Sequence, residues 1–435
     1  MRTAKTRRTL AVVAGTGVMA LALVGCTRGG AEPAPTTDPS GDATTAPAVV
    51  ASPGITDTTL TFGISTPLTG ATAGPGNCTA DGAIAYFGYK NAEGGITFGD
   101  GKTRTIEIKT YDDEYSPEKS LANFQQMVAD GVFAGGIGLG TPTNRAWREA
   151  AIDEEFPQVL VMTGDPIFSS WEESPWQLGL VAKYQQEGGA MGELLATSDA
   201  PHKVAIIAQN DDFGAGYVEG FKEAIAGSPN IEIVSEQTYE PTDTTLDGQI
   251  TAAAGSGADV LFNAVSVTPL VIGEVQKAQS LGWFPYWFMP SNTSSPGGVL
   301  IPGGAVNDAG EPVYPGMYSV AFSAVAAAPN FAELPNGQLF LDSIAEYTNQ
   351  EGVPAFPHCV WSWIGAQILE EAFVNMTEPT RESFMEALRN IRGFVPDFML
   401  EGTSIDTTTD GMPAVGSVVV QKFNGKGFVT VDTFQ

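Results

Sequence analysis

The sequence predicts an α/β protein in which two similar units are each built on a parallel sheet. Strand-like and helix-like segments alternate from Thr59 onward, and a second series of the same kind begins at Lys203. About 380 residues follow Gly54, which is too many for one hydrophobic core and suits two domains of ordinary size. Short connections between alternating strands and helices are typical of a parallel sheet that helices cover on both faces.

The first series of elements contains four predicted strands and the helices between them. Alternating or continuous apolar residues predict the strands at 59–64, 106–108, 132–139 and 159–162. Ser116-Pro117 offers a helix N-cap followed by a proline in the first turn, so a helix is expected to begin there. The apolar stripes of the helices are formed by Ala83, Ile84 and Phe87, by Leu121, Phe124, Met127 and Val128, and by Ala146, Trp147, Ala150 and Ala151.

The second series is followed by a longer C-terminal region. Val204–Ala208 is a continuous apolar run that predicts a buried strand, and a polar loop separates it from a helix with an apolar stripe. Further strands are expected at 231–234, 260–262 and 286–288, and further helices at 245–255 and 269–281. The C-terminal region is predicted to hold helices at 337–349, 360–375 and 381–391 and strands at 418–420 and 428–430. Trp361 and Trp363 lie in one of these apolar helices, where we expect them to pack in the core.

Residues 1–26 carry the features of an export signal. Basic residues at its start precede an apolar run from Leu10 to Val24, which is too short to span a membrane. Leu23-Val24-Gly25-Cys26 resembles the lipobox of bacterial lipoproteins, which implies that residues 1–25 are a signal peptide and that Cys26 is lipidated. Two acyl chains would then anchor the mature chain stably to the cell membrane. The alternative is an ordinary secretory signal with an incidental cysteine.

Residues 26–54 are predicted to be a flexible tether. They are dominated by Ala, Pro, Thr, Gly and Asp and hold no aromatic residue, so they lack the apolar surface that would offset their ordering entropy. The whole chain has 21 Lys and Arg against 50 Asp and Glu, and loss of four basic residues with the signal takes the net charge from −29 to about −33. This charge argues against a nucleic-acid partner and against direct docking on anionic lipids. We expect membrane contact through the lipid anchor only.

Two cysteines remain after Cys26, and the chain has two histidines. Cys78 and Cys359 form an even pair in an oxidising compartment, so the alternatives are a disulfide between them or two separate buried thiols. No Cys-x-x-Cys or His-Glu-x-x-His spacing occurs, and His202 and His358 fall outside the predicted loops. We expect no metal and no cofactor.

Polar loops follow the predicted strands, and these loops are the candidate site. In open parallel sheets, ligands bind beyond the carboxyl ends of the strands, where loops and helix N-termini converge. Two such sheets facing one another would form a cleft between the units. The loops are 65–70, 140–144, 163–166, 209–214, 266–268 and 290–292.

The loops and their flanking segments resemble type I periplasmic binding proteins of the leucine/isoleucine/valine-binding kind. Pro67-Leu68-Thr69-Gly70 is followed by an alanine-rich helix that ends in Asn-x-x-Gly-Gly-Ile and by a strand leading to Tyr111-Asp112-Asp113. Later, Asp211-Asp212-Phe213-Gly214 precedes a Gly-x-x-x-Gly-Phe helix, with phenylalanine where the family usually has tyrosine. The order and spacing of these pieces extend the resemblance over residues 57–435.

The resemblance implies an architecture and a function. Two Rossmann-like lobes would be joined by a three-strand hinge, with lobe 1 formed by 55–178 and 323–398 and lobe 2 by 179–322 and 399–435. Members of the family close on a small molecule and deliver it to the permease subunits of an ABC importer. The expected ligand is an amino acid or a related amide or organic acid. The protein would be an extracytoplasmic, lipid-anchored monomer and not an enzyme.

The resemblance also implies site residues in the first lobe. Family members hold a ligand carboxylate with a Ser/Thr loop after the third strand and a Thr-containing loop after the fourth. By position these loops supply Thr141 and Thr143, then Thr163, Gly164 and Asp165. Hydroxyls and backbone N–H groups at helix starts suit an anion. Asp165 either pairs with a cation of the ligand or caps the helix that follows it.

The second lobe is expected to contribute Phe213, Ser266, Ser291 and Asn292. In the family an acid near Ser291 usually holds the ligand amino group, whereas this chain has only the neutral Ser291 and Asn292 there. Phe213 either contacts the ligand or fills the base of its loop. Ser266 either donates a hydrogen bond to the ligand or caps the helix that begins near Pro269.

Two other functions are alternatives to solute capture for import. A surface receptor that signals to a membrane partner would use the same cleft. A surface hydrolase is disfavoured, because no Gly-x-Ser-x-Gly motif occurs and neither histidine lies in a candidate loop. The Asp211-Asp212 pair is the remaining acid–base candidate, and the resemblance implies that these residues shape their loop.

Overall fold

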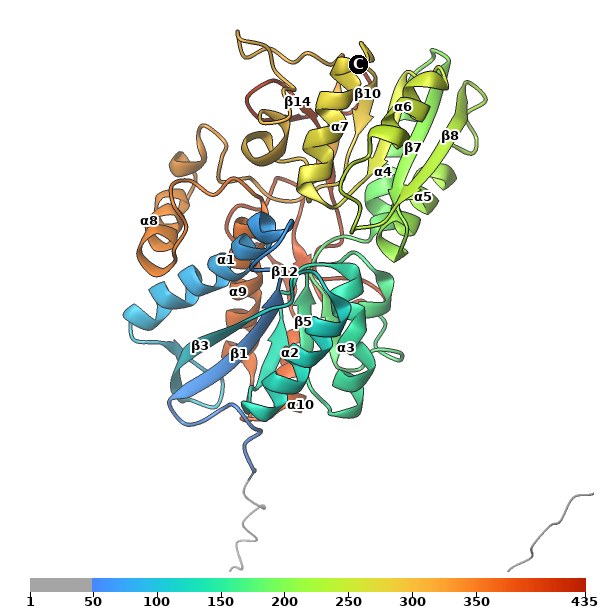
Figure 1. Cartoon of the computed structure of the whole chain (residues 1–435). Coiled ribbons are helices and arrows are strands. Elements are labelled where there is room, and N and C mark those ends of the chain that lie inside the picture. The colour runs from blue at the N-terminus through green and yellow to red at the C-terminus, as the bar shows by residue number, and fades with distance from the viewer. Residues whose placement is uncertain (1–48) are drawn as a thin grey trace, which may run out of the picture. The chain divides into compact units, whose positions relative to one another are not determined.

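The structure is a computed structural model that describes residues 49–435. This part of the chain holds two large sheets, each with helices on both faces (Figure 1). The predicted α/β fold with two lobes is therefore confirmed. Cys26, the predicted signal peptide and most of the predicted tether lie outside the described residues.

The first sheet has the strand order β2-β3-β1-β4-β5-β6. Its pairs are parallel except for β2 and β3, which form a short antiparallel hairpin at one edge. The strands are β1 (Thr59–Thr66), β2 (Ile96–Thr97), β3 (Thr103–Asp112), β4 (Ala134–Gly136), β5 (Gln158–Val161) and β6 (Gln177–Gly179).

Helices cover both faces of this first sheet. One core lies under α1 (Ala73–Ala92), α8 (Gly337–Tyr347), α9 (His358–Asn375) and α10 (Arg381–Leu388). The core of the other face is formed under α2 (Pro117–Ala129) and α3 (Thr141–Asp153), where the rings of Phe124 and Trp147 stack 5.2 Å apart. As predicted, Ser116 caps α2 by accepting a hydrogen bond from the Lys119 N–H.

The second sheet has the strand order β15-β14-β11-β10-β9-β7-β8. It is parallel from β8 to β11 and antiparallel at its other edge, where a tight turn joins β14 to β15 and so reverses the chain. The strands are β7 (His202–Gln209), β8 (Ile231–Tyr239), β9 (Val260–Ala264), β10 (Tyr286–Phe288), β11 (Met317–Ala321), β14 (Val419–Phe423) and β15 (Phe428–Thr430).

Strand β7 shows why this sheet is buried on both sides. Successive side chains of a strand point to opposite faces. Ala205 and Ile207 enter the core under α6 (Asp247–Gly255) and α7 (Thr268–Ser280), whereas Val204 and Ile206 enter the core under α4 (Tyr184–Ala196) and α5 (Asp212–Ile225). A strand that contributes to two cores must be apolar along its buried middle, as residues Val204–Ala208 are.

The chain passes between the two sheets three times. The first passage follows β6 and leads to α4, and the second follows β11. The third comes before β14 and runs beside the first, because the Ala414 and Val415 N–H groups each donate 2.9 Å hydrogen bonds to the carbonyls of Gly179 and Leu180. Beside the second passage, the Leu400 N–H donates to the Phe322 carbonyl at 2.9 Å.

The third passage lies later in the chain than the expected division at residue 398. Strand β13 (Ile405–Asp406) pairs with β12 (Arg392–Phe394), and Ile405, Ala414 and Val415 are buried in the core of the first sheet. Residues 399–415 therefore pack with lobe 1, and we propose that lobe 2 resumes near residue 416. Within residues 49–435, none of the helices is both long and apolar enough for a membrane span.

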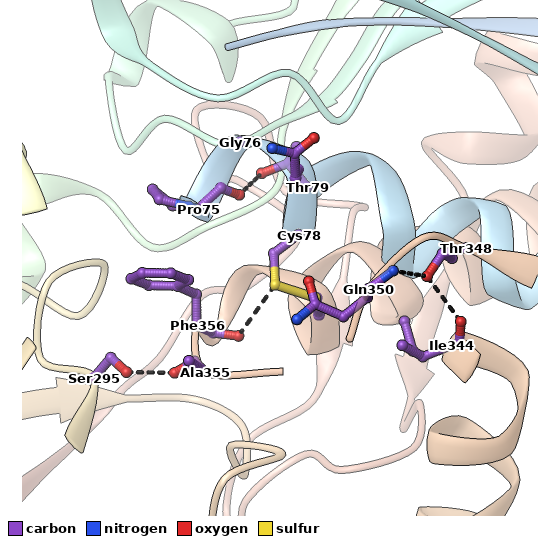
Figure 2. The surroundings of a disulfide bond; sticks show 12 residues. Pro75, Gly76, Cys78, Thr79, Ser295, Ile344, Thr348, Gln350, Ala355 and Phe356 are labelled. Atoms are coloured by element: carbon purple, nitrogen blue, oxygen red, sulfur yellow. Dashed lines mark hydrogen bonds between the residues drawn. A yellow bond between two sulfur atoms is a disulfide. The ribbon is translucent and has the colours of Figure 1, made fainter. Parts of the chain in front are cut away.

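A disulfide joins Cys78 in α1 to Cys359 in α9 (Figure 2). Both cysteines are buried, and their Cα atoms are 4.3 Å apart. The two helices approach this closely because residue 82 is glycine: a Cβ atom there would lie 2.1 Å from the Cys359 carbonyl oxygen. The bond links segments 281 residues apart in the sequence and so fixes α9 against the first helix of lobe 1.

Removal of this disulfide is expected to destabilise the protein by about 2–4 kcal/mol. Without the bond, the unfolded chain no longer has a very long loop held closed, so its conformational entropy rises. The test is thermal unfolding of a Cys78→Ser/Cys359→Ser variant, followed by circular dichroism. Reductant should lower the melting temperature of the wild type and leave that of the variant unchanged. Equal melting temperatures for the two proteins in the absence of reductant would contradict the prediction.

Candidate functional site

A cavity lies between the lobes, at the carboxyl ends of the strands of both sheets. Its own lining nearly fills it in this arrangement, and about 30 Å³ of free volume is left. Lobe 1 contributes the ends of β3, β4 and β5 and the starts of α1, α3 and α9, and lobe 2 contributes α4, α5 and the loops after β9 and β10. The lining residues are Thr72, Pro75, Tyr115, Leu139, Gly140, Thr141, Met162, Val181, Tyr184, Glu187, Phe213, Tyr217, Ser266, Ser291, Asn292, His358 and Trp361.

Tyr115 reaches from lobe 1 toward lobe 2. It follows β3 in a left-handed backbone conformation (φ 61°), and its hydroxyl lies 3.5 Å from the Ser266 hydroxyl of lobe 2. Gly140 makes room for it, since a Cβ atom at that position would lie 2.5 Å from the Tyr115 ring. Gly140 also has a positive φ of 106°, which side chains rarely tolerate. The glycine before α3 thus allows an aromatic ring to close one side of the cavity.

Three hydroxyl groups form a closed set at the N-terminus of α3. The Thr141 Oγ1 atom lies 2.9 Å from both the Thr163 Oγ1 atom and the Tyr184 Oη atom, and Tyr184 donates to Thr163 at 3.0 Å. All three residues are buried, and Thr141 and Tyr184 line the cavity. Hydroxyls and the N-terminus of a helix together favour an oxygen atom of a ligand.

Glu187 is the acidic residue of the cavity. It projects from α4 and accepts hydrogen bonds from the Tyr217 hydroxyl, the Ser291 hydroxyl (3.0 Å) and the Ser291 N–H (3.3 Å). Burial raises its pKa to about 7, against the opposing effect of these hydrogen bonds. The family pattern implies an acid near Ser291, and the structure brings one to Ser291 from a helix more than 100 residues earlier.

The electrostatics of the cavity are those of a site for a neutral or positively charged group. Among the lining residues, none carries a positive charge, since burial lowers the pKa of His358 to about 3 and keeps its imidazole neutral. Both ring nitrogens of His358 and the Oδ1 atom of Asn292 have no hydrogen-bond partner within the described part of the chain. Buried polar atoms without partners are costly, so these atoms are unsatisfied in this arrangement of the cavity.

Aromatic rings form the apolar walls. Phe213 meets the Tyr184 ring edge-on with 4.9 Å between ring centroids, and Tyr184 stacks on Tyr217 at the same distance. Trp361 also lines the cavity, whereas Trp363 is fully buried and packs edge-on against Tyr86. The expectation of core packing thus describes Trp363 and only partly describes Trp361.

An ion-pair cluster connects the lobes beside the cavity. Arg145 of α3 pairs with Asp165 of lobe 1 and, at 2.8 Å, with Asp212 at the start of α5 in lobe 2. Asp165 also caps the short helix Pro166–Phe168 by accepting from the Ile167 N–H at 3.1 Å. The Arg145–Asp212 ion pair and the proximity of the Tyr115 and Ser266 hydroxyls both join lobe 1 to lobe 2. These contacts are those of a protein whose lobes are closed on each other.

Five of the nine ligand-binding residues expected from the sequence line the cavity: Thr141, Phe213, Ser266, Ser291 and Asn292. The other four lie behind its wall. Thr143 donates to the Leu139 carbonyl at 2.7 Å, and Thr163 supports the hydroxyl set described above. Gly164 packs so closely that a Cβ atom would lie 2.4 Å from the Ala182 carbonyl oxygen, and Asp165 is held by its cap and by Arg145.

The sequence reasoning missed several lining residues and misplaced one. His358 was expected away from the site, yet it lines the cavity, because α9 begins there. Tyr217 and Glu187 lie within helices α5 and α4, and neither follows a strand directly. The signal that would have found Glu187 is its place on the buried face of α4, three residues after Tyr184 and four before Met191. Asp211 shapes its loop as implied, capping α5 through the Phe213 N–H at 3.0 Å.

The described residues contain no group of His, Cys, Asp and Glu side chains that would hold a metal ion.

The raised pKa of Glu187 predicts a pH dependence of stability. Between its ordinary value of 4.5 and about 7, the folded protein binds more protons than the unfolded chain, so the free energy of unfolding falls as pH rises through this window. In the wild type, the free energy of unfolding should fall by on the order of 3 kcal/mol between pH 4.5 and 7 because of Glu187, and Glu187→Gln should remove this fall. Urea unfolding at a series of pH values measures this.

Glu274→Gln is the matched control for this measurement. Glu274 is buried in the core of lobe 2, its pKa is raised by burial to about 8, and it accepts a 2.7 Å hydrogen bond from Asn263. Glu274→Gln should remove the fall in the free energy of unfolding between pH 4.5 and about 8, which is a wider window than the one that Glu187→Gln removes. If the slope in Glu187→Gln matches that of the wild type, the carboxyl of Glu187 does not titrate as described.

Comparisons with known proteins agree with this geometry. A family model described as periplasmic binding protein matches residues 59–427. The Leu/Ile/Val-binding protein homolog 3 of Brucella melitensis is 25% identical over 207 residues, which is 47% of this chain and 53% of that protein. The chain thus spans about half the length of this curated relative.

Solved structures share the fold. A branched-chain amino acid ABC transporter protein from Thermus thermophilus, with bound valine, has a TM-score of 0.73 at 17% identity, covering 86% of this chain and 95% of that one. A fatty acid ABC transporter substrate-binding protein from Thermomonospora curvata has a TM-score of 0.72 at 21% identity, covering 88% and 94%. The family match over most of the chain and the shared two-lobed fold show that this protein belongs to the type I periplasmic binding proteins, a family of solute-binding proteins and not of enzymes.

Proposed function

We propose that the protein is an extracytoplasmic receptor that captures a small polar solute between its lobes and delivers it to an ABC importer. The observation that carries this proposal is the cavity whose walls come from both lobes and whose unpartnered polar atoms belong to both. A solute that contacts both walls binds the closed arrangement better than an open one, and this difference drives closure.

The chemistry of the walls favours an amino acid or a related amide. Glu187 and Ser291 suit an amino or amide N–H group, and Thr141 at the start of α3 suits a carboxylate or carbonyl oxygen. The aromatic rings of Phe213 and Trp361 suit an apolar substituent. Two of the similar proteins support this class through their names, which refer to leucine, isoleucine and valine and to bound valine.

The expected test result is that a matching solute raises the melting temperature, because mass action adds about 2.7 kcal/mol at a hundredfold excess over Kd. A panel of amino acids, primary amides and small organic acids is screened by thermal unfolding, and hits are measured by calorimetry. Glu187→Gln should weaken binding of a hit that carries an N–H head group about 10- to 100-fold, since the lost hydrogen bond involves a charged or ionisable partner.

Glu274→Gln serves as the control in the binding measurement, because Glu274 is a buried acid of the same lobe that does not line the cavity. It should bind the hit as the wild type does. Two results would count against the proposal: no solute of the panel stabilises the protein, or Glu187→Gln and Glu274→Gln bind a hit equally well.

We also propose that the mature chain begins at Cys26 and is anchored by lipid at that residue. The support is the lipobox-like Leu23-Val24-Gly25-Cys26 after a basic and apolar segment. An anchor of this kind keeps the receptor near the permease while the body of the protein stays free to bind solute.

Cys26→Ser is expected to release the protein from the membrane, because the acyl chains supply its membrane affinity. The protein is expressed in a bacterium that processes lipoproteins, and membrane and soluble fractions are compared by immunoblot. The Cys78→Ser/Cys359→Ser variant is the matched control and should stay with the membrane. Retention of Cys26→Ser in the membrane fraction, or an unlipidated mass for the mature wild type, would overturn the proposed anchor.

A further inference from the structure

A second cavity lies directly beside the first, at the segments that pass between the lobes. It has a free volume of about 260 Å³, against about 30 Å³ for the first cavity. Its walls include the end of β11, the second passage between the lobes from Ser323 to Ala328, and Leu400 near residues of that passage. Trp361 and Ser291 line both cavities, so these two side chains are the shared wall.

The second cavity is apolar and uncharged. Its lining, within the described residues, contains no Asp, Glu, Lys, Arg or His side chain, in contrast to Glu187 and His358 in the first cavity. Valine, alanine, leucine and aromatic side chains supply most of the wall, and serines and two amides supply the rest. Such a surface gains from burying hydrocarbon and offers nothing to a charged group.

A buried hydroxyl in this wall lacks a partner. Ser323 is 3% exposed, and its Oγ atom has no hydrogen-bond partner in the part of the chain that the structure describes. In the first cavity the same holds for the Oδ1 atom of Asn292 and both ring nitrogens of His358. Native proteins rarely leave such atoms unsatisfied. An aliphatic chain would not satisfy the Ser323 hydroxyl, so the argument for a shared occupant rests on the shared wall and on the apolar lining.

Trp361 lies in the wall between the first and the second cavity. Its ring lies against Phe322, with 5.2 Å between ring centroids, and against the His358 ring at 4.8 Å. These contacts hold an apolar ring face at the junction and leave Ser291, a partner of Glu187, on the polar side. A chain that passes Trp361 would leave the polar head site and enter a hydrocarbon-lined space.

We infer that the two cavities form one elongated site and that the solute is an amphiphile. This inference rests on the proposed function and narrows its ligand class. A nitrogen-bearing head group binds at Glu187, Ser291 and Asn292, and an unbranched aliphatic tail extends past Trp361 to Ser323 and Leu400. A ligand of this shape fits a second cavity that is uncharged, mostly apolar and shares two wall residues with the first.

The test compares solutes that share a head group and differ in chain length. The probes are norvaline, norleucine and α-aminocaprylic acid, and in parallel butanamide, hexanamide and octanamide, with affinities measured by calorimetry. If the tail enters the second cavity, affinity should rise about fourfold for each added methylene, because each is buried from water.

Two variants fill the second cavity and leave the head site intact. Ser323→Phe places a ring at the buried hydroxyl, and Ala328→Leu narrows the wall at a half-buried position where the fold is less at risk. Both should bind the shortest probe as the wild type does and lose the gain of the longer ones. Ser280→Phe, at an exposed position of α7, controls for the added aromatic ring.

The outcomes separate this inference from the proposed function. Affinity that rises with chain length in the wild type and stays flat in both cavity variants supports the elongated site. Short probes that bind while longer ones bind no better, or a rise that both variants retain, overturns it and leaves solute capture standing. If these series fail and another small polar solute binds, the amphiphile is excluded. If no solute binds at all, the proposed function fails as well.

Discussion

The two sheets face each other at the edges where their parallel strands end, and the cavity depends on this arrangement. In a parallel sheet, every strand ends at the same edge and is followed there by a loop and a helix. Loops and helix N-termini are therefore concentrated at that edge. In this protein Tyr115, Thr141, Ser266 and Ser291 all follow strands, although they lie far apart in the sequence. The chain passes between the sheets three times, and these three segments keep the two edges facing each other. The disulfide between Cys78 and Cys359 fixes the first turn of α9, which lines the cavity. Solute capture then needs no chemistry beyond complementary walls and a fold that brings them together.

Glu187 gives this cavity its character. A carboxyl group removed from water is costly when charged, and its pKa of about 7 expresses that cost. Three hydrogen bonds from Tyr217 and Ser291 reduce the cost without removing it. A ligand cation or N–H group would complete the compensation, which makes the empty site less favourable than the filled one. The second cavity differs in kind, because its lining within residues 49–435 has no Asp, Glu, Lys, Arg or His side chain and gains from apolar burial. The two spaces together describe a solute with a polar end and an apolar end.

The sequence predicted the fold well because periodicity and strand-following loops are local properties. The apolar runs at Val204–Ala208 and in α9 and the cap at Ser116 lie where they were expected. Cavity-lining residues close to strand ends were predicted for the same reason: Thr141 and Phe213 lie in the first turns of α3 and α5, and Ser291 follows β10. Glu187, Tyr217 and His358 were not predicted, since none of them follows a predicted strand directly and each reaches the cavity through tertiary packing. Asp165 illustrates the converse: its place in the sequence suited a ligand contact, but Arg145 of the neighbouring helix engages it. The packing of Ile405, Ala414 and Val415 in the core of the first sheet is likewise a tertiary feature. It accompanies the pairing of β12 with β13, which no local sequence pattern predicted.

Closure of two lobes around a solute is the central claim, and a distance across the cleft tests it most directly. Spin labels at Glu149 in α3 and Glu219 in α5 sit on exposed positions of opposite lobes, on helices that meet beside the Arg145–Asp212 ion pair. The native Cys78 and Cys359 are joined to each other and so are closed to labelling, and a Cys26→Ser background removes the remaining thiol. The account predicts a broad or long distance distribution without solute and a single shorter distance once a solute is bound. An unchanged distribution under conditions where calorimetry shows full binding would contradict it.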